Sequence, residues 1–161
     1  MAVAKGMTRL AEQTPRVEQF HQDRFGAFYR AHGLTIEEAR PGEVVVRLPH
    51  AADAQRGGGG TDALNGGVMA YMFDGALGAA VASAALHRLD GRDVDLSRFG
   101  QVTVTLNINY LRAARGDAFE ARGVALQVGG SLGFAEGKLY DERGDLCASA
   151  SGVWRIFLPD R

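Results

Sequence analysis

One long apolar segment constrains the fold of this chain more than any other feature. Residues 68–89 read VMAYMFDGALGAAVASAALHRL, and nearly all of them are apolar or small. The segment is long enough for about six helical turns at 3.6 residues per turn. A helix that is apolar on almost every side must be buried on almost every side. The chain therefore needs other elements that wrap around a central helix.

Four segments after this helix have the pattern of β-strands. Turns rich in Gly, Asp and Ser separate them, and their sequences are QVTVTLNINYL, AFEARGVALQV, LGFAEGKLYD and LCASASGVWRIF. The first segment alternates most clearly. Side chains at alternate positions of a strand share one face, which here predicts a common face for Val102, Val104, Leu106, Ile108 and Tyr110.

Small residues occupy single faces of the last three strand segments. They are Gly123 and Ala125, then Ala135 and Gly137, then Ala148, Ala150 and Gly152. A sheet lined with small residues lets a bulky element lie close against it, and the apolar helix is the candidate. We therefore predict an α+β fold in which a curved antiparallel β-sheet wraps around a long central helix.

The chain before the central helix is predicted to add a further helix and a hairpin. Pro15 can open a helix that runs to about Ala31. The extended runs LTIEEA and EVVVRLP flank Pro41 and Gly42, a pair typical of a tight turn between strands. Residues 50–67 contain four consecutive glycines, and we expect them to form a mobile, irregular loop.

Length and composition exclude several classes of function. The 161 residues fit a flexible tail over 1–15 and a single domain over 16–161. A net charge of -1 gives no basic excess, which argues against nucleic acid as a partner. Cys147, the single cysteine, lies in a run of small and apolar residues and is predicted to be buried, as suits a reducing cytoplasm. We predict a cytoplasmic protein.

Membrane and metal sites are not expected either. No uninterrupted apolar run reaches the roughly 18 residues of a membrane span, so no membrane partner is predicted. The four histidines are scattered without the spacing of metal ligands, and no glycine-rich phosphate-binding motif follows a strand. The sequence therefore predicts no metal.

Asp74 is the most informative polar residue of the central helix. It is the only charged residue between Asp62 and His87, in the segment most committed to burial. An uncompensated buried carboxylate costs several kcal/mol, so it is retained either for a structural partner or for chemistry. One interpretation pairs Asp74 with an arginine, such as Arg88 or Arg112, or has it cap a neighbouring turn; the other makes it a catalytic carboxylate.

A second feature lies at the start of the same helix, where Asn65 precedes Gly66 and Gly67. First-turn backbone N–H groups lack partners within a helix and carry the positive end of its dipole. Two glycines there allow a carbonyl oxygen or an anion to approach closely, which is the outline of an oxyanion hole. The alternative is that Asn65 is simply the N-cap and the glycines bend the chain.

The spacing of the two features predicts a dimer. Gly66 and Asp74 are eight residues apart, or about 12 Å along a helix, too far for one substrate carbon to meet both in one chain. Two copies related by a two-fold axis, with their helices antiparallel, would bring the amide end of one helix to the carboxylate of the other. If the chain is a catalyst, it is a catalytic homodimer.

Two motifs resemble a known family. The segment LNGGVMAYMFDGALG resembles the motif that opens the central helix in the phenylacetic-acid-type (PaaI-like) acyl-CoA thioesterases of the hotdog superfamily, and VTVTLNINYLRAA resembles the strand that follows it. The resemblance covers about residues 34–157. It implies a hotdog fold, hydrolysis of an acyl-CoA thioester to free acid and CoA, and a homodimer that assembles further as a dimer of dimers. It implies no cofactor, because CoA is part of the substrate.

The resemblance also implies roles for particular residues. Gly66 would offer the backbone N–H that polarises the thioester carbonyl, and Asp74 of the partner copy would act as general base or as nucleophile. Thr103 falls where some relatives place a hydroxyl that orients the attacking water. Asn65 replaces the usual histidine. Gly59 stands where some relatives use Asn or Gln, so Asn65 is the candidate to take over that hydrogen bond.

Substrate contacts are marked less clearly. The candidates for binding CoA are Gly67, Arg112, Arg115, Gly130 and Ser131. Candidates for an acyl pocket are Met69, Tyr71, Met72 and Phe73, although helical spacing equally predicts core packing for them.

Other functions within the same fold remain open. A hydratase or dehydratase needs a histidine beside its carboxylate, and none closely follows Asp74. A non-hydrolytic acyl-CoA-binding protein would gain little from a buried carboxylate. A structural dimer would require Asp74 to be paired.

Overall fold

The computed structural model describes residues 26–57, 61–90 and 95–158. The strands are β1 (Thr35–Arg40), β2 (Glu43–Leu48), β3 (Gly100–Tyr110), β4 (Phe119–Val128), β5 (Leu132–Asp141) and β6 (Leu146–Phe157). The long helix is α3 (Gly66–His87), and η1 (Asp53–Gln55) and η2 (Leu96–Arg98) are short 3-10 turns. Residues 26–31 are also helical. The remainder of the helix predicted from Pro15, and the tail over 1–15, lie outside the described residues.

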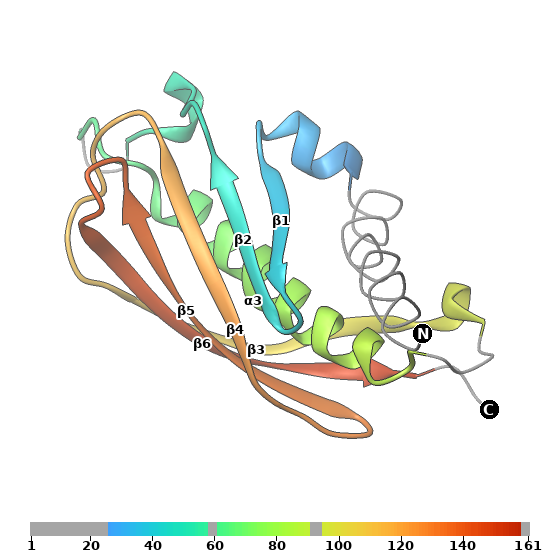
Figure 1. The fold of residues 1–161 in the computed structure, drawn as a ribbon. Coiled ribbons are helices and arrows are strands. Elements are labelled where there is room, and N and C mark those ends of the chain that lie inside the picture. The colour runs from blue at the N-terminus through green and yellow to red at the C-terminus, as the bar shows by residue number, and fades with distance from the viewer. Residues whose placement is uncertain (1–25, 58–60, 91–94, 159–161) are drawn as a thin grey trace, which may run out of the picture.

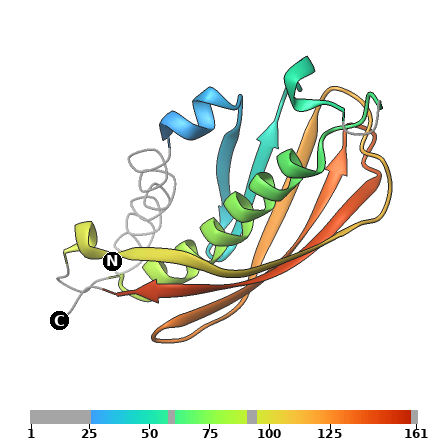
Figure 2. The same ribbon diagram turned by 180° about the vertical axis from the view of Figure 1, so that it is seen from behind.

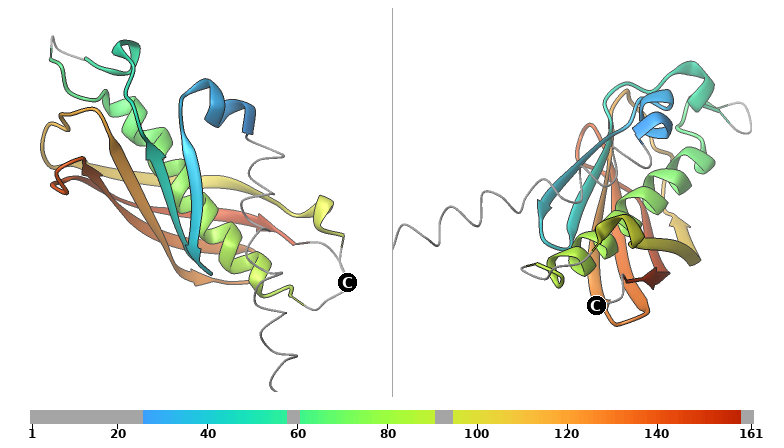
Figure 3. Two further views of the ribbon diagram at one scale, coloured as in Figure 1. Left: turned by 45° about the horizontal axis from the view of Figure 1, so that its top comes forward. Right: turned by 90° about the vertical axis from the view of Figure 1, so that its right-hand side faces the viewer.

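The six strands form one antiparallel sheet that curves around α3 (Figures 1 and 2). Their order across the sheet is β1-β2-β4-β5-β6-β3, so β1 and β3 are the edge strands. The predicted hairpin is present as β1 and β2, and the four later strands are present in the predicted order. The two further directions of Figure 3 show α3 lying across the concave side of the sheet. The predicted α+β architecture is therefore confirmed.

Small residues of the sheet allow this close packing. A Cβ added at Gly123 would overlap the backbone carbonyl of Ala76 on α3. At Gly137 it would come within 2.5 Å of the Leu77 side chain. A larger side chain at either position would push the helix off the sheet, because a packed interior has no free space to receive it. The small-residue faces predicted from the sequence thus have the expected role.

A β-bulge in β3 corrects one prediction. Thr103 pairs with Trp154 and Thr105 with Val153, so β3 carries one extra residue between them. A single inserted residue exchanges the two faces of the strand that follows it. Thr103 therefore faces α3 on one side of the bulge, while Leu106, Ile108 and Tyr110 face it on the other. The common face predicted for Val102 through Tyr110 is wrong.

The segment before α3 is more ordered than predicted. It contains η1 and an isolated bridge between Arg56 and Leu64. The backbone N–H of Asn65 donates to the Gln55 carbonyl at 2.9 Å, and that of Gly57 donates to Ala63 at 2.9 Å. The prediction of a wholly irregular loop over 50–67 is therefore wrong at both its ends. The helix also begins at Gly66 rather than Val68, because Asn65 caps it.

The composition of α3 also corrects the expectation about membrane-like segments. Gly66–His87 is long and apolar enough to cross a membrane by composition alone, but 72% of its most apolar window is buried inside the fold. Such burial is what a core helix requires.

Cys147 is fully buried, as predicted, and burial raises the pKa of its thiol.

Candidate active site

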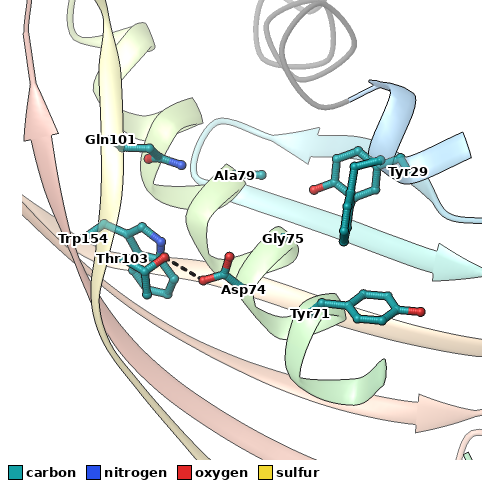
Figure 4. A pocket seen from close by; sticks show the side chains of 9 residues that line it. Tyr29, Tyr71, Asp74, Gly75, Ala79, Gln101, Thr103 and Trp154 are labelled. Atoms are coloured by element: carbon teal, nitrogen blue, oxygen red, sulfur yellow. Dashed lines mark hydrogen bonds between the residues drawn. The ribbon is translucent and has the colours of Figure 1, made fainter. Parts of the chain in front are cut away.

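Asp74 faces β3 from the middle of α3. The Thr103 hydroxyl donates a hydrogen bond to Asp74 Oδ1 at 2.7 Å (Figure 4). The β3 bulge makes this contact possible, because it turns Thr103 toward the helix while the rest of the strand keeps its pairing with β6. The carboxylate is thus held in place by a neutral donor.

Asp74 is exposed in the single chain, which corrects the prediction that it is buried. Gly67 is exposed as well, and between and beside them Ala70, Tyr71 and Gly75 are only partly buried. Positions three and four apart share one face of a helix, so these residues form an open stripe along the first half of α3. The stripe is open because, in the described part of the chain, β3 is the edge of the sheet and no further strand lies beyond it.

The salt-bridge interpretation of Asp74 is wrong. Arg112 pairs with Asp145 at 3.3 Å. Arg88 donates to the carbonyls of Val128 and Gly129. Within the described part of the chain, no basic side chain pairs with Asp74, so Asp74 forms no salt bridge there.

Two backbone amides at the N-terminus of α3, those of Gly66 and Gly67, differ in whether they have a hydrogen-bond partner. The Asn65 side chain accepts from the Gly67 N–H at 2.8 Å and donates to the Gly57 carbonyl at 3.1 Å. Asn65 is therefore the N-cap, and the Gly67 amide is already occupied. None of the residues described accepts from the Gly66 N–H. This leaves Gly66 as the amide of the pair that a ligand can reach, while a direct substrate contact of Asn65 stays a prediction.

The α3 helix runs antiparallel to β3, and two contacts show the alignment. The Tyr110 hydroxyl donates to the Gly66 carbonyl at 2.9 Å, while Thr103 reaches Asp74 near the middle of the helix. The Gly66 amide and the Asp74 carboxylate therefore lie at different heights along the same edge strand. As the spacing predicted, one chain does not bring them together.

The predicted CoA-binding residues fall into two separate groups. Arg112 lines an open cleft of about 620 Å³ that also contains Gly66, Gly67 and Asn65. Arg115 does not line this cleft and pairs with Asp62 at 3.1 Å.

Gly130 and Ser131 lie in the turn between β4 and β5. The carbonyls of the neighbouring residues Val128 and Gly129 accept from Arg88, the residue that caps the C-terminal end of α3. This turn is therefore at the opposite end of the helix from Gly66. A role for Gly130 and Ser131 in binding CoA stays a prediction, and one protomer does not join the two groups.

Most of the predicted acyl-pocket residues belong to the core. Met72 and Phe73 are fully buried and Met69 is 4% exposed. Tyr71 is the exception, because it lines a cavity of about 190 Å³ that begins at Asp74 and Thr103. Figure 4 shows Tyr29 and Tyr71 on one side of Asp74, and Gln101, Thr103 and Trp154 on the other.

Several residues of this cavity were not predicted from the sequence as site residues, among them Tyr29, Gln101 and Trp154. The signal that could have revealed two of them is Gly78, a glycine inside a helix, where it costs stability relative to alanine. A Cβ at Gly78 would lie 3.0 Å from Trp154 Nε1 and 3.2 Å from Gln101 Nε2. Gln101 also donates to the Gly78 carbonyl at 2.9 Å. Gly75, a second glycine inside α3, is the comparable signal for Tyr29, because a Cβ there would lie 2.7 Å from the Tyr29 hydroxyl oxygen.

The chemistry available at the site is that of one carboxylate and one free amide. Within the described ranges, no three residues of the His, Cys, Asp and Glu types gather to hold a metal ion. Among the residues that the structure describes, no histidine lines the cavity beside Asp74. A carboxylate held by a hydroxyl suits general-base or nucleophilic work, and an amide at a helix N-terminus suits stabilisation of a developing oxyanion.

This fold and this chemistry define a hotdog protein with a candidate acyl-transfer site, and comparison with known proteins agrees. The Thioesterase superfamily model matches residues 62–148, which is more than half of the chain. The match includes α3 with both Gly66 and Asp74, and it includes Thr103. The chain belongs to the thioesterase superfamily.

Particular relatives are moderately similar. The chain is 36% identical over 104 residues to a putative esterase of Halobacterium salinarum, covering 65% of this chain and 63% of that protein. It is 33% identical over 98 residues to the medium/long-chain acyl-CoA thioesterase YigI of Escherichia coli, covering 58% of this chain and 62% of YigI. The chain thus aligns with less than two thirds of the length of either relative.

Among solved structures, the PaaI protein from the phenylacetic acid degradation operon of E. coli shares the fold. Its TM-score is 0.74 at 17% sequence identity, and the alignment covers 92% of this chain and 96% of PaaI. At this identity the likeness concerns the fold alone. It agrees with the hotdog architecture implied by the sequence motifs.

Proposed function

We propose that this protein hydrolyses an acyl-CoA thioester to a free acid and CoA, in a site that two copies of the chain share. The observation that carries the proposal is the Asp74 carboxylate, which opens onto a cavity, has no basic partner in the described chain and is held by Thr103. The match to the Thioesterase superfamily supports the choice of reaction, as does the similarity to YigI, an acyl-CoA thioesterase.

The free β3 edge supports the shared site. It is 11 residues long, and Val102 and Val104 are 53% and 56% exposed. A long apolar edge strand presents unpaired N–H and C=O groups and favours pairing with another strand. We infer that β3 pairs antiparallel with β3 of a second copy, which also covers the open stripe of α3.

The contacts along β3 define the register that such a dimer needs. If the two-fold axis passes through Asn107 and the bulge of β3 also interrupts this pairing, Tyr110 of one copy is opposite Thr103 of the other. Because Tyr110 contacts Gly66 and Thr103 contacts Asp74, the same register sets the free amide of one copy near the carboxylate of the other. A dimer of dimers stays a prediction, as does a cytoplasmic location.

In the proposed mechanism, the partner's α3 supplies the oxyanion site. The thioester carbonyl accepts from the Gly66 N–H, and negative charge that develops on its oxygen is stabilised there. Asp74 either takes a proton from a water that attacks the carbonyl carbon, or attacks that carbon itself to form an anhydride that water then opens. In both routes the C–S bond breaks and CoA leaves as a thiolate, which becomes the thiol by taking up the proton that the water gives up. Thr103 fixes the carboxylate in either case. Arg112, beside Gly66 in the open cleft, is the nearer candidate for contacting CoA.

The test is thiol release from acyl-CoA esters, including phenylacetyl-CoA and medium-chain esters. The wild-type protein should hydrolyse members of the panel, and Asp74→Asn should lower kcat by roughly 10²–10⁴-fold. Asp53→Asn, in the exposed turn η1, is the matched control and should keep wild-type activity.

Two results would contradict this proposal. Asp74→Asn could fold, as judged by circular dichroism, and keep its activity. Alternatively, the wild-type protein could bind acyl-CoA tightly by calorimetry and hydrolyse none of the panel, which would favour a non-hydrolytic acyl-CoA-binding protein.

A further inference from the structure

The cavity beside Asp74 is closed on one side by residues that precede the superfamily match. Phe28 and Tyr29 come from the helical residues 26–31, whereas the match begins at residue 62. Tyr29 is 7% exposed and belongs to the main core cluster, so its ring is fixed. Phe28 is 43% exposed and lies at the outer side. This wall is therefore a feature of this chain rather than of the matched motif.

Tyr29 lies directly against α3 beside Asp74. A Cβ on Gly75 would be 2.7 Å from the Tyr29 hydroxyl oxygen, so the glycine gives the phenol its place. Burial, and secondarily the charge of Asp74, raise the pKa of Tyr29 well above its usual value. The phenol therefore stays neutral, and it fills space next to the carboxylate without adding a second charge.

The mouth of the cavity is braced by neighbouring rings. The Phe28 ring lies 4.2 Å from His32 and 5.6 Å from Tyr71, measured between centroids. Gln55 Nε2 donates to the Tyr71 hydroxyl at 3.1 Å and to the His32 carbonyl at 2.8 Å. These contacts join the segment before β1, the turn η1 and α3. The wall is consequently anchored at several points.

The far end of the cavity is closed by the sheet and by α3. Ala79 and Trp154 are almost fully buried there, and Gly78 lets the indole approach the helix. The volume is about 190 Å³. A protein cavity of about 150 Å³ holds one benzene molecule, so this space fits an acyl group of roughly six to eight carbons. A longer chain would have to displace Tyr29.

We propose that Phe28 and Tyr29 form the specificity-determining wall of the acyl pocket and restrict this protein to compact acyl groups. The inference rests on the proposed function, since it assigns the cavity beside Asp74 to the acyl part of the thioester. It distinguishes this chain from its relative YigI, a medium/long-chain acyl-CoA thioesterase.

The experiment is a chain-length profile of kcat/KM for straight acyl-CoA esters from two to sixteen carbons. The wild-type profile should peak at or below roughly eight carbons and fall by about tenfold or more at twelve. Tyr29→Leu opens the wall and should move the peak to longer chains. Tyr29→Phe keeps the size of the ring and should leave the peak where it is, which separates size from the hydroxyl.

Two further variants guard against a folding defect. Phe28→Ala removes an exposed ring from the same wall and should shift the profile in the same direction as Tyr29→Leu. Phe134→Ala truncates a ring of similar exposure on β5, outside the cavity, and should leave the profile unchanged. Circular dichroism and thermal unfolding identify variants that fail to fold, in which case Phe28→Ala decides.

The outcomes separate this inference from the proposed function. Two results would refute the proposed role of Phe28 and Tyr29 in chain-length selection. One is efficient hydrolysis of twelve- to sixteen-carbon esters by the wild-type protein. The other is an unshifted peak in folded Tyr29→Leu and Phe28→Ala proteins. If no ester is hydrolysed, the proposed function fails. Calorimetry with non-hydrolysable thioether analogues of the same chain lengths then decides whether the wall selects by size.

Discussion

Two faces of α3 use small residues differently. On the face that packs against β4 and β5, small residues let the helix lie close to the sheet. On the face beside β3, they leave a stripe of the helix open. Gly123 and Gly137 sit under the closed face, where a single added carbon would collide with the helix. Gly66 and Gly75 lie on the open face, where their lack of a side chain makes room for the rings of Tyr110 and Tyr29. One helix thus supplies both the core and the candidate site.

The difference between the faces follows from the position of each strand in the sheet. β4 and β5 lie inside the strand order and are paired on both sides, while β3 is an edge. Interior strands can surround a helix within one chain. An edge strand leaves its side of the helix for another chain to cover. The residues that stabilise the fold and the residues of the candidate site therefore lie on different faces of one helix, not in different domains.

The largest expected effect on the open face, after loss of Asp74 itself, comes from the Gly66 amide. Gly66→Pro removes that N–H and should lower kcat by roughly 10²–10³-fold. Proline is tolerated at the first position of a helix, and Asn65 already has the extended backbone that precedes proline, with φ -64° and ψ 139°. Gly66→Ala adds the same Cβ but keeps the N–H, and should retain most activity in the same steady-state assay.

Mixing two inactive proteins tests whether the site is shared. Asp74→Asn and Gly66→Pro each spoil one half, so a mixed dimer keeps one complete site. After co-refolding equal amounts, about a quarter of wild-type activity should return. If native mass spectrometry shows mixed dimers but no activity returns, both groups of one site belong to the same chain, and the proposal that two copies share the site is refuted.

On the closed face the expected effect is on stability. Gly123→Ala should lower the free energy of unfolding by about 1–3 kcal/mol, because its Cβ meets the helix backbone rather than a flexible side chain. Gly130→Ala is the matched control, since nothing lies within 4 Å of its Cβ position, and it should change stability by about 0.5 kcal/mol or less. Urea unfolding measures both. Equal effects would mean that the helix does not rest on Gly123.

The smallest expected effect concerns the hydroxyl that holds Asp74. Thr103→Val keeps the shape of the side chain but removes a hydrogen bond to a charged group, and should lower kcat about tenfold with little change in KM. Thr105→Val alters the same residue type beyond the bulge, where it does not face α3, and should stay within about twofold of wild type. Equal losses in both variants would show that the effect is on the strand and not on Asp74.

The sequence predicted the Asp74 site only in part, and both errors concern which side of an element is covered in the folded chain. The helix position, the isolated carboxylate and the glycines at its start could be identified from neighbouring residues. The predicted burial of Asp74 is wrong, because a helix that is apolar all around does not need to be covered on every side by its own chain. The face of Thr103 could not be obtained by counting alternate residues, since the bulge depends on the pairing of β3 with β6.

By itself, the sequence determined the central helix, the antiparallel strands and the small-residue faces that let them pack. These properties depend on local periodicity and side-chain volume, which the order of residues encodes directly. Only the tertiary structure decided that Asp74 is open, that Thr103 reaches it and that Tyr29 closes the cavity beside it. Each of these depends on which strand forms the edge and on contacts between segments far apart in the chain, where local patterns carry no information.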